Sequence, residues 1–123
     1  MNFSVQKLDF SSAGQGATLA TFSVPADLIG FAVRVTSVTG APTNYVIAAY
    51  PVVDNIMISD GSGLNTGAKA SPGAYPLDLW GSTVIGPVFR NAIDKWRLVA
   101  IFSGGTSPTI SGTAYALVNE TKY

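Results

Sequence analysis

The stretch Trp96–Val118 reads WRLVAIFS-GGTSP-TISGTAYALV and carries the clearest fold signal of the chain. Two of its runs, 96–103 and 109–118, are rich in β-branched, aromatic and alternating apolar residues, which is typical of β-strands. Between them lies Gly104–Pro108, whose glycines and proline are turn residues. The stretch therefore predicts two antiparallel strands that are joined as a β-hairpin.

The same texture continues through the rest of the chain. Short alternating runs, bounded by Gly, Pro, Ser, Thr and Asn, predict further strands at 3–10, 17–24, 31–38, 45–52, 55–59, 75–80 and 83–89. The run 45–52 is almost continuously apolar, which predicts a strand buried on both faces. Residues 91–95 are the only candidate for a helical turn.

Eight or nine short strands with almost no helical periodicity favour an all-β fold of two packed antiparallel sheets. Within that class we expect a jelly roll, with an immunoglobulin-like sandwich that lacks the usual cysteine pair as the alternative. A chain of 123 residues fits a single domain, 1–123. In it, residues 1–10 form either an N-terminal arm or the first strand, 60–76 form a long mobile loop, and 119–123 form a frayed tail.

The charge content is low and balanced. Charged residues make up 11% of the chain, against about 25% in an average protein, and seven Lys and Arg balance seven Asp and Glu. A cationic surface for nucleic acid is therefore not expected, and weak charge repulsion favours association into a homo-oligomer. No apolar run reaches the roughly 18 residues of a membrane span, and the N-terminus lacks the pattern of a signal peptide.

The chain has no histidine and no cysteine, so the commonest general base, metal ligand and strong nucleophile are missing. A carboxylate dyad of Asp78 with Asp94 has no supporting spacing. The segments 54–55 and 60–63 offer oxygen ligands for calcium but fall short of a known calcium-loop pattern, and turns are the better interpretation. We therefore expect no enzyme activity, no catalytic residues, no cofactor and no metal site.

The aromatic residues leave two interpretations open. Six of them lie on or near predicted strands: Tyr45, Tyr50, Tyr75, Trp80, Trp96 and Tyr115. Packing in the core or at a subunit interface is the commoner use of such side chains. An exposed Trp80 beside the long loop would instead point to a glycan-binding site, as aromatic rings stack on sugars.

Residues 80–118, through the predicted hairpin and the Ala-, Gly-, Ser- and Thr-rich texture, resemble small all-β bacteriophage head decoration (cement) proteins. The resemblance implies a virion protein that is assembled in the host cytoplasm. It also implies a homotrimer that sits on the major capsid protein and stabilises the shell. Proteins of this kind have no catalytic residues to carry over.

Our leading hypothesis is therefore a viral structural protein that stabilises a phage head through multivalent protein–protein contacts. A carbohydrate-binding, lectin-like module and a phage tail or fibre subunit are the alternatives. The expected partners are the major capsid protein and further copies of the chain, without nucleic acid or membrane; a glycan is a partner only under the lectin-like alternative. The predicted shell-contact or interface residues are Phe3, Val5, Leu64, Tyr75 and Trp80.

Overall fold

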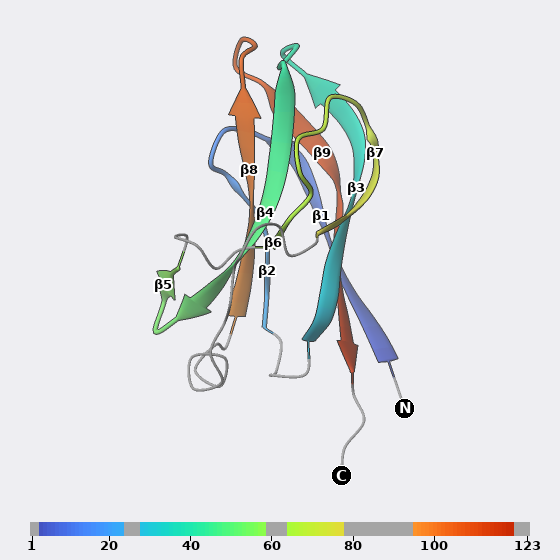
Figure 1. Cartoon of the computed structure of the whole chain (residues 1–123), viewed down its shortest axis with the longest axis vertical. Coiled ribbons are helices and arrows are strands. Elements are labelled where there is room, and N and C mark those ends of the chain that lie inside the picture. Colours follow the sequence, from blue (N-terminus) through green and yellow to red (C-terminus); the bar gives the residue numbers. More distant parts are fainter. Residues whose placement is uncertain (1–2, 24–27, 59–63, 78–94, 120–123) are drawn as a thin grey trace.

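The computed structural model describes residues 3–23, 28–58, 64–77 and 95–119, and every regular element in these ranges is a β-strand. The strands are β1 Phe3–Ala13, β2 Thr18–Phe22, β3 Leu28–Thr39, β4 Asn44–Val53, β5 Ile56–Met57, β6 Leu64–Asn65, β7 Gly73–Leu77, β8 Lys95–Ser103 and β9 Thr109–Asn119. They form two layers, with β8 and β4 in one and β9, β3 and β1 in the other (Figure 1).

The two sheets have the strand order of a jelly roll. One has the order β1-β9-β3-β7 and the other the order β2-β8-β4-β5, with β6 beside β4. All strand pairs are antiparallel. Strands β1 to β4 alternate between the sheets, whereas a constant-type immunoglobulin sandwich keeps its first two strands side by side. The predicted β-sandwich is confirmed as a jelly roll, and the immunoglobulin-like alternative is wrong.

The predicted hairpin between 96–103 and 109–118 is also wrong, although both strands exist. β8 and β9 belong to different sheets, and the link between them crosses the edge of the sandwich. Thr106 N donates to Gly40 O at 2.9 Å, so this link is fastened to the one that carries β3 into β4. Gly105 has φ +81°, and a Cβ there would meet the carbonyl oxygen of Gly40. A glycine-rich link of this length can join two strands of one sheet as a hairpin, or it can cross from one sheet to the other. Here the inward faces of β8 and β9 are buried from opposite sheets, so the link crosses.

Residues 3–10 form the first strand of the sheet and not a free arm. β1 pairs with β9 from Phe3, opposite Asn119, to Phe10, opposite Gly112. The strand also runs through the predicted break at residue 11 as far as Ala13, with a register shift after Phe10. Asn119, the first residue of the predicted frayed tail 119–123, lies in this ladder, and residues 120–123 lie outside the described ranges.

The predicted mobile loop 60–76 contains β6 and most of β7. Tyr45 and Lys69 exchange two backbone hydrogen bonds of 2.8 Å each, and Thr66 N donates to Ile47 O at 3.0 Å. Residues 64–69 are therefore bonded to β4, and residues 73–76 pair with β3. The predicted strand 83–89 and most of the predicted helical turn 91–95 lie outside the described residues, and Lys95 begins β8.

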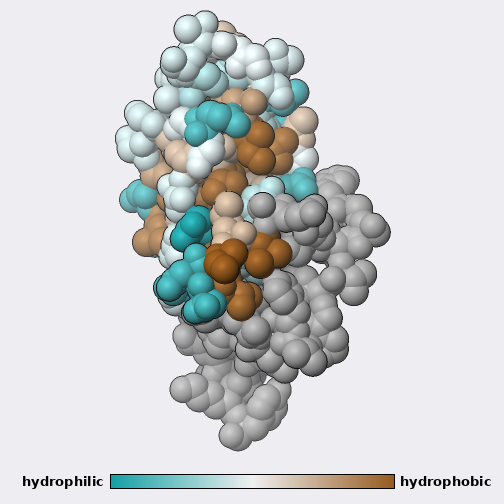
Figure 2. Space-filling model, turned by 90° about the vertical axis from the view of Figure 1, so that its left-hand side faces the viewer, coloured by the Kyte–Doolittle hydropathy of each residue, from teal (hydrophilic) through white to brown (hydrophobic). Residues whose placement is uncertain are grey.

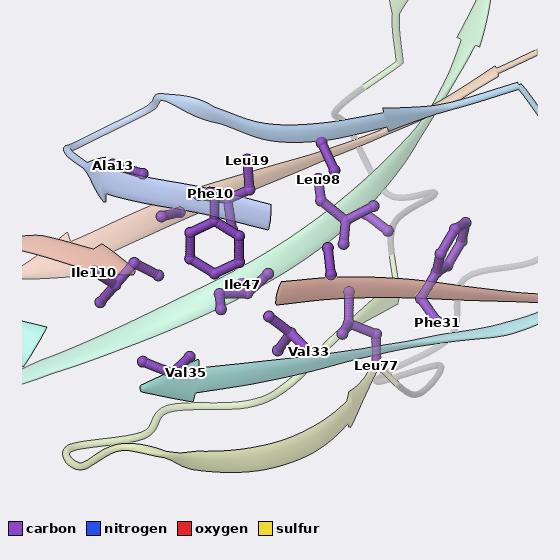
Figure 3. Packing of buried hydrophobic residues seen from close by; sticks show 14 of the residues in the cluster. Phe10, Ala13, Leu19, Phe31, Val33, Val35, Ile47, Leu77, Leu98 and Ile110 are labelled. Atoms are coloured by element: carbon purple, nitrogen blue, oxygen red, sulfur yellow. The ribbon is translucent and has the colours of Figure 1, made fainter. Parts of the chain in front are cut away.

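The core lies between the sheets and is built from alternate residues of facing strands (Figure 3). The side chains of Tyr45, Ile47, Leu98 and Ile110 are fully buried. Each buried side chain of this size stabilises the fold by about 1.5–3 kcal/mol relative to an exposed one. The ring of Phe31 lies 5.5 Å from that of Trp96 and 5.9 Å from that of Phe22, which joins both sheets at one end.

Candidate interaction surfaces

The described residues bring no catalytic or metal-binding cluster together. They contain no group of three or more side chains of the kinds that hold a metal ion. Asp54 and Asn55 both have positive φ, 51° and 63°, and form the two-residue turn of the β4–β5 hairpin. The candidate calcium segment 54–55 is thus a turn, whereas the segment 60–63 and the proposed dyad of Asp78 with Asp94 lie outside the described residues.

In the described part of the chain, no helix has the length and apolar character that crossing a membrane requires.

Two of the six aromatic residues are core residues. Tyr45 and Trp96 are buried in the hydrophobic cluster between the sheets. Tyr50, Tyr75 and Tyr115 are half-buried. Trp80, on which the glycan interpretation depends, lies outside the described residues.

Leu64 and Tyr75 pack against the core from neighbouring strands, β6 and β7. The hydroxyl of Tyr75 donates to Ser71 O at 2.7 Å, and Lys69 Nζ lies 4.9 Å from the centre of its ring. Tyr45 donates to the same carbonyl oxygen at 2.6 Å. Burial, with a smaller contribution from Tyr75, raises the pKa of Tyr45 above the ordinary range of a tyrosine. Tyr75 therefore has a structural task, which is to hold the segment before β7 in place.

The five predicted contact residues do not form one surface. Phe3 and Val5 lie on β1, at one edge of the four-stranded sheet, and Tyr75 lies on β7, at the other edge. Leu64 lies on β6, next to β7. Trp80 is outside the described ranges. The four described residues thus mark two separate edges of the sandwich.

An apolar surface that sequence reasoning did not select lies on the outer face of the five-stranded sheet. There Val46 stands opposite Ile101, and Ala48 stands opposite Val99. We call these four residues the β4–β8 patch. They alternate with the core residues of the same strands and so point away from the core. Figure 2 shows apolar residues gathered along the middle of this side of the molecule, below a more hydrophilic upper end.

The patch combines covered and exposed side chains. Ile101 is 39% exposed, whereas Ala48 and Val99 are 3% and 6% exposed. Arg97 lies next along β8, opposite Tyr50, and its Nε is buried without a hydrogen-bond partner. The sequence did give one signal for this patch. The run 45–52 lacks alternating polar residues, so it was predicted to be a strand without a water-facing side. This signal did not identify Ile101 on the neighbouring strand.

A second exposed apolar pair lies at the free edge of the four-stranded sheet. Val5 on β1 stands opposite Leu117 on β9, and the two are 61% and 36% exposed. Further along β1, Thr113 Oγ1 donates to Asp9 Oδ1 at 2.7 Å. Leu8 is 42% exposed although its partner Ala114 is buried in the core. Val5 is therefore an exposed apolar residue at the edge of the sheet, and its role in a contact stays a prediction.

No family model matches the sequence, and no curated protein matches it. Solved structures match it at the level of the fold. The structure of the infectious bursal disease virus Gx strain aligns with 100% of this chain and 34% of its own, at 11% identity and a TM-score of 0.55. The infectious bursal disease virus VP2 subviral particle aligns with 98% of this chain and 34% of its own, at 15% identity and a TM-score of 0.51.

The structure of the Gt strain of the same virus gives a third match, with 13% identity, a TM-score of 0.51, and coverage of 100% of this chain and 32% of its own. The chain thus spans about a third of the length of the solved chains that it matches. At these identities the likeness defines the class of fold: a jelly-roll sandwich of the kind found in viral coat proteins. More particularly, the whole described sandwich is similar to a part of the birnavirus VP2 chain.

Proposed function

We propose that this chain is a non-enzymatic structural protein of a virus particle, which works by covering and bracing other protein surfaces. The fold-level likeness to VP2 over the whole chain supports a structural role in a virion. In its finer form, the proposal is a decoration (cement) subunit of a bacteriophage head. Such a subunit would bind the major capsid protein and further copies of the chain, as the homotrimer that the resemblance implies or as a dimer.

The observation that carries the proposal is the β4–β8 patch. An antiparallel sandwich in water normally alternates, with apolar side chains on its core face and polar ones on its outer face. On β4 and β8, the two central strands of their sheet, two successive outward positions of each strand are apolar and lie in register. Ile101 is 39% exposed and Val46 is half-buried. Covering the apolar surface that these two side chains leave in water gains about 25 cal/mol for each Å².

The net charge of the chain supports the same function. With a net charge of zero, copies of the chain do not repel one another over long range. Single contacts of modest area are weak, yet a particle repeats them many times, so that the total binding is strong through multivalency. The jelly roll thus supplies a rigid block, and its surfaces supply the contacts.

The separate edges favour two kinds of contact. We assign Phe3 and Val5 on β1 to contacts between copies of the chain. Leu64, Tyr75 and Trp80 are assigned, with the β4–β8 patch, to contacts with the shell. For Phe3, Val5 and Tyr75, this division follows the positions of β1 and β7 at opposite edges of one sheet. Leu64 is included because β6 lies next to β7, and Trp80 is included from the sequence alone.

Charge introduced into the patch tests the proposal. Ile101→Lys places an ammonium group on an exposed apolar position, so the fold should persist while association is lost. Thr106→Lys, at an exposed position in the link between β8 and β9, is the matched control. Co-sedimentation with purified capsids should pellet the wild type and the control and leave Ile101→Lys in the supernatant. Pelleting of a folded Ile101→Lys variant to the wild-type extent would contradict the assignment of the patch.

A further inference from the structure

We infer that two copies of this chain join edge to edge through β1. The two strands run antiparallel, with Leu8 on the two-fold axis, and the two four-stranded sheets become one continuous sheet. This inference concerns a second copy as the partner and does not rest on the viral role or on the β4–β8 patch.

The edge of β1 is open. β1 pairs with β9 on one side, and the described residues place no strand on its other side. Its backbone N–H and C=O groups on that side are therefore a template for another strand. The ladder with β9 is regular from Phe3 to Phe10, so the strand is straight enough to accept one.

The other edges in the described part of the chain are protected. β7 contains Pro76, which has no N–H to donate. β2 is five residues long with a register shift between Thr18 and Ala20. β5 and β6 have two residues each. Natural sheets use short strands, proline and bulges in this way to prevent unwanted pairing. Among the described strands, only β1 combines length and regularity at an edge without a proline.

Leu8 provides an apolar contact at the centre of this edge. It lies in register with Ala114, on the core-facing side of the sheet, yet 42% of its surface is exposed. The neighbouring inward residue, Phe10, is buried. Leu8 is thus a core-type side chain whose outer flank is uncovered. A second Leu8 across a two-fold axis would cover it with an identical side chain.

Charge complementarity fixes the register. Lys7 and Asp9 flank Leu8 and share the outer face of the sheet, opposite Tyr115 and Thr113 of β9. With Leu8 on the axis, Lys7 stands opposite the partner's Asp9 and Asp9 stands opposite the partner's Lys7. An axis at Lys7 or at Asp9 would set like charges opposite each other, which destabilises a strand pair. The alternating charges therefore select one pairing and disfavour its nearest competitors.

The proposed contact between the two β1 strands forms a closed dimer. A two-fold interface uses the same surface of both copies, so it stops at a dimer and does not grow into a fibre. The register shift between Phe10 and Ala13 interrupts the regular strand, so the new ladder ends there. The regular pairing thus covers residues 6–10 of both copies.

Single cysteines test this register directly, because the natural chain has none. A disulfide requires Cα atoms closer than about 7 Å. Leu8→Cys should cross-link on mild oxidation into a species of twice 12.7 kDa on a non-reducing gel. Val5→Cys is the matched control: it is more exposed than Leu8, but its two copies would lie about 20 Å apart along the strands. Val5→Cys should therefore remain monomeric on the gel.

Charge exchange gives a second and independent test. Lys7→Asp places two pairs of carboxylates opposite each other, so the dimer should dissociate at a concentration where the wild type stays paired. The double variant Lys7→Asp, Asp9→Lys restores both opposite-charge pairs and should recover the wild-type dissociation constant in sedimentation equilibrium. Circular dichroism verifies that each variant is folded.

Three results would overturn the inference. The first is a folded wild-type chain that sediments as a monomer over the whole concentration range. The second is a Val5→Cys variant that cross-links as readily as Leu8→Cys. The third is a double charge variant as weak as Lys7→Asp alone. Ile101→Lys tests binding to the shell and leaves β1 unchanged, whereas the cysteine and charge variants test the pairing of copies. The proposed function and this inference can therefore fail separately.

Discussion

The hydroxyl groups of Tyr45 and Tyr75 donate to a single acceptor, the carbonyl oxygen of Ser71, at 2.6 and 2.7 Å. Tyr45 belongs to β4 in the five-stranded sheet, and Tyr75 belongs to β7 in the four-stranded sheet. The shared acceptor therefore ties the two sheets together at the edge where β7 lies. It also holds the connection between β6 and β7, which the sequence suggests is a mobile loop.

The stability of the protein should fall in alkaline solution because of Tyr45. Its pKa is raised above the ordinary value of 10.0, so the unfolded chain gives up this proton at a lower pH than the folded one. The contribution is fully present below pH 10 and is lost as the pH rises toward the folded-state pKa, at up to about 1.4 kcal/mol per pH unit. Urea unfolding between pH 8 and pH 11 measures this slope. Tyr45→Phe should remove it, and an equally steep loss in that variant would assign the effect to another group.

Thr66 should be the most sensitive polar residue of the segment between β6 and β7. Its buried hydroxyl accepts from Ile47 N at 3.1 Å and donates to Gly67 O at 2.8 Å. Thr66→Val keeps the shape but leaves these groups unpaired, at a cost of about 1–3 kcal/mol. Thr66→Ser retains the hydroxyl and is the control, with a much smaller loss expected in denaturant unfolding. A loss in Thr66→Val no larger than that in Thr66→Ser would contradict a special role of the hydroxyl.

Gly112 should not tolerate a side chain. It stands between Phe10 of β1 and Val35 of β3, and an added Cβ would collide with the backbone carbonyl of Arg34. Because backbone atoms in a central strand cannot move aside, Gly112→Ala should unfold the chain or cost more than about 3 kcal/mol. Gly30→Ala is the matched control, since nothing lies within 4 Å of its added Cβ. Thermal unfolding of both variants measures the difference. A Gly112→Ala protein as stable as the wild type would contradict the pairing of β3 with β9.

Removal of residues 1–10 should abolish folding and not merely particle binding. The truncation exposes the edge of β9 and takes Phe10 out of the core. Phe10→Ala alone should cost about 3–5 kcal/mol, whereas Lys7→Ala, at an exposed position of the same strand, should change stability by less than about 0.5 kcal/mol. Far-ultraviolet circular dichroism with thermal unfolding measures all three. A truncated chain that melts cooperatively at the wild-type temperature would restore the idea of a free arm.

The strands could be predicted from the sequence because alternation reports which face of a strand is buried. The pairing of strands could not. The runs 96–103 and 109–118 have the pattern of a hairpin, but each buries its inward face in a different sheet. A link such as Gly104–Pro108 fits either arrangement, and only the three-dimensional packing against β3 and β4 selects the crossing.

The contact residues stay predictions, and the structure shows where the described ones lie. Val5 is an apolar residue in an alternating strand, and it lies on an exposed edge. Leu8 and Ile101 gave no signal in the sequence, because their exposure depends on which strand lies at the edge and which face of a sheet is uncovered. The internal contacts of the Tyr75 hydroxyl and ring could not be predicted either. These outcomes depend on strand order, which one sequence does not encode locally.

The most direct test of the proposed virion role is the protein composition of virus particles purified from the source of this sequence. Quantitative mass spectrometry of such particles should find the chain in a fixed, high ratio to the coat protein after gradient purification. Intact, infectious particles that contain the coat protein but not this chain would contradict the account.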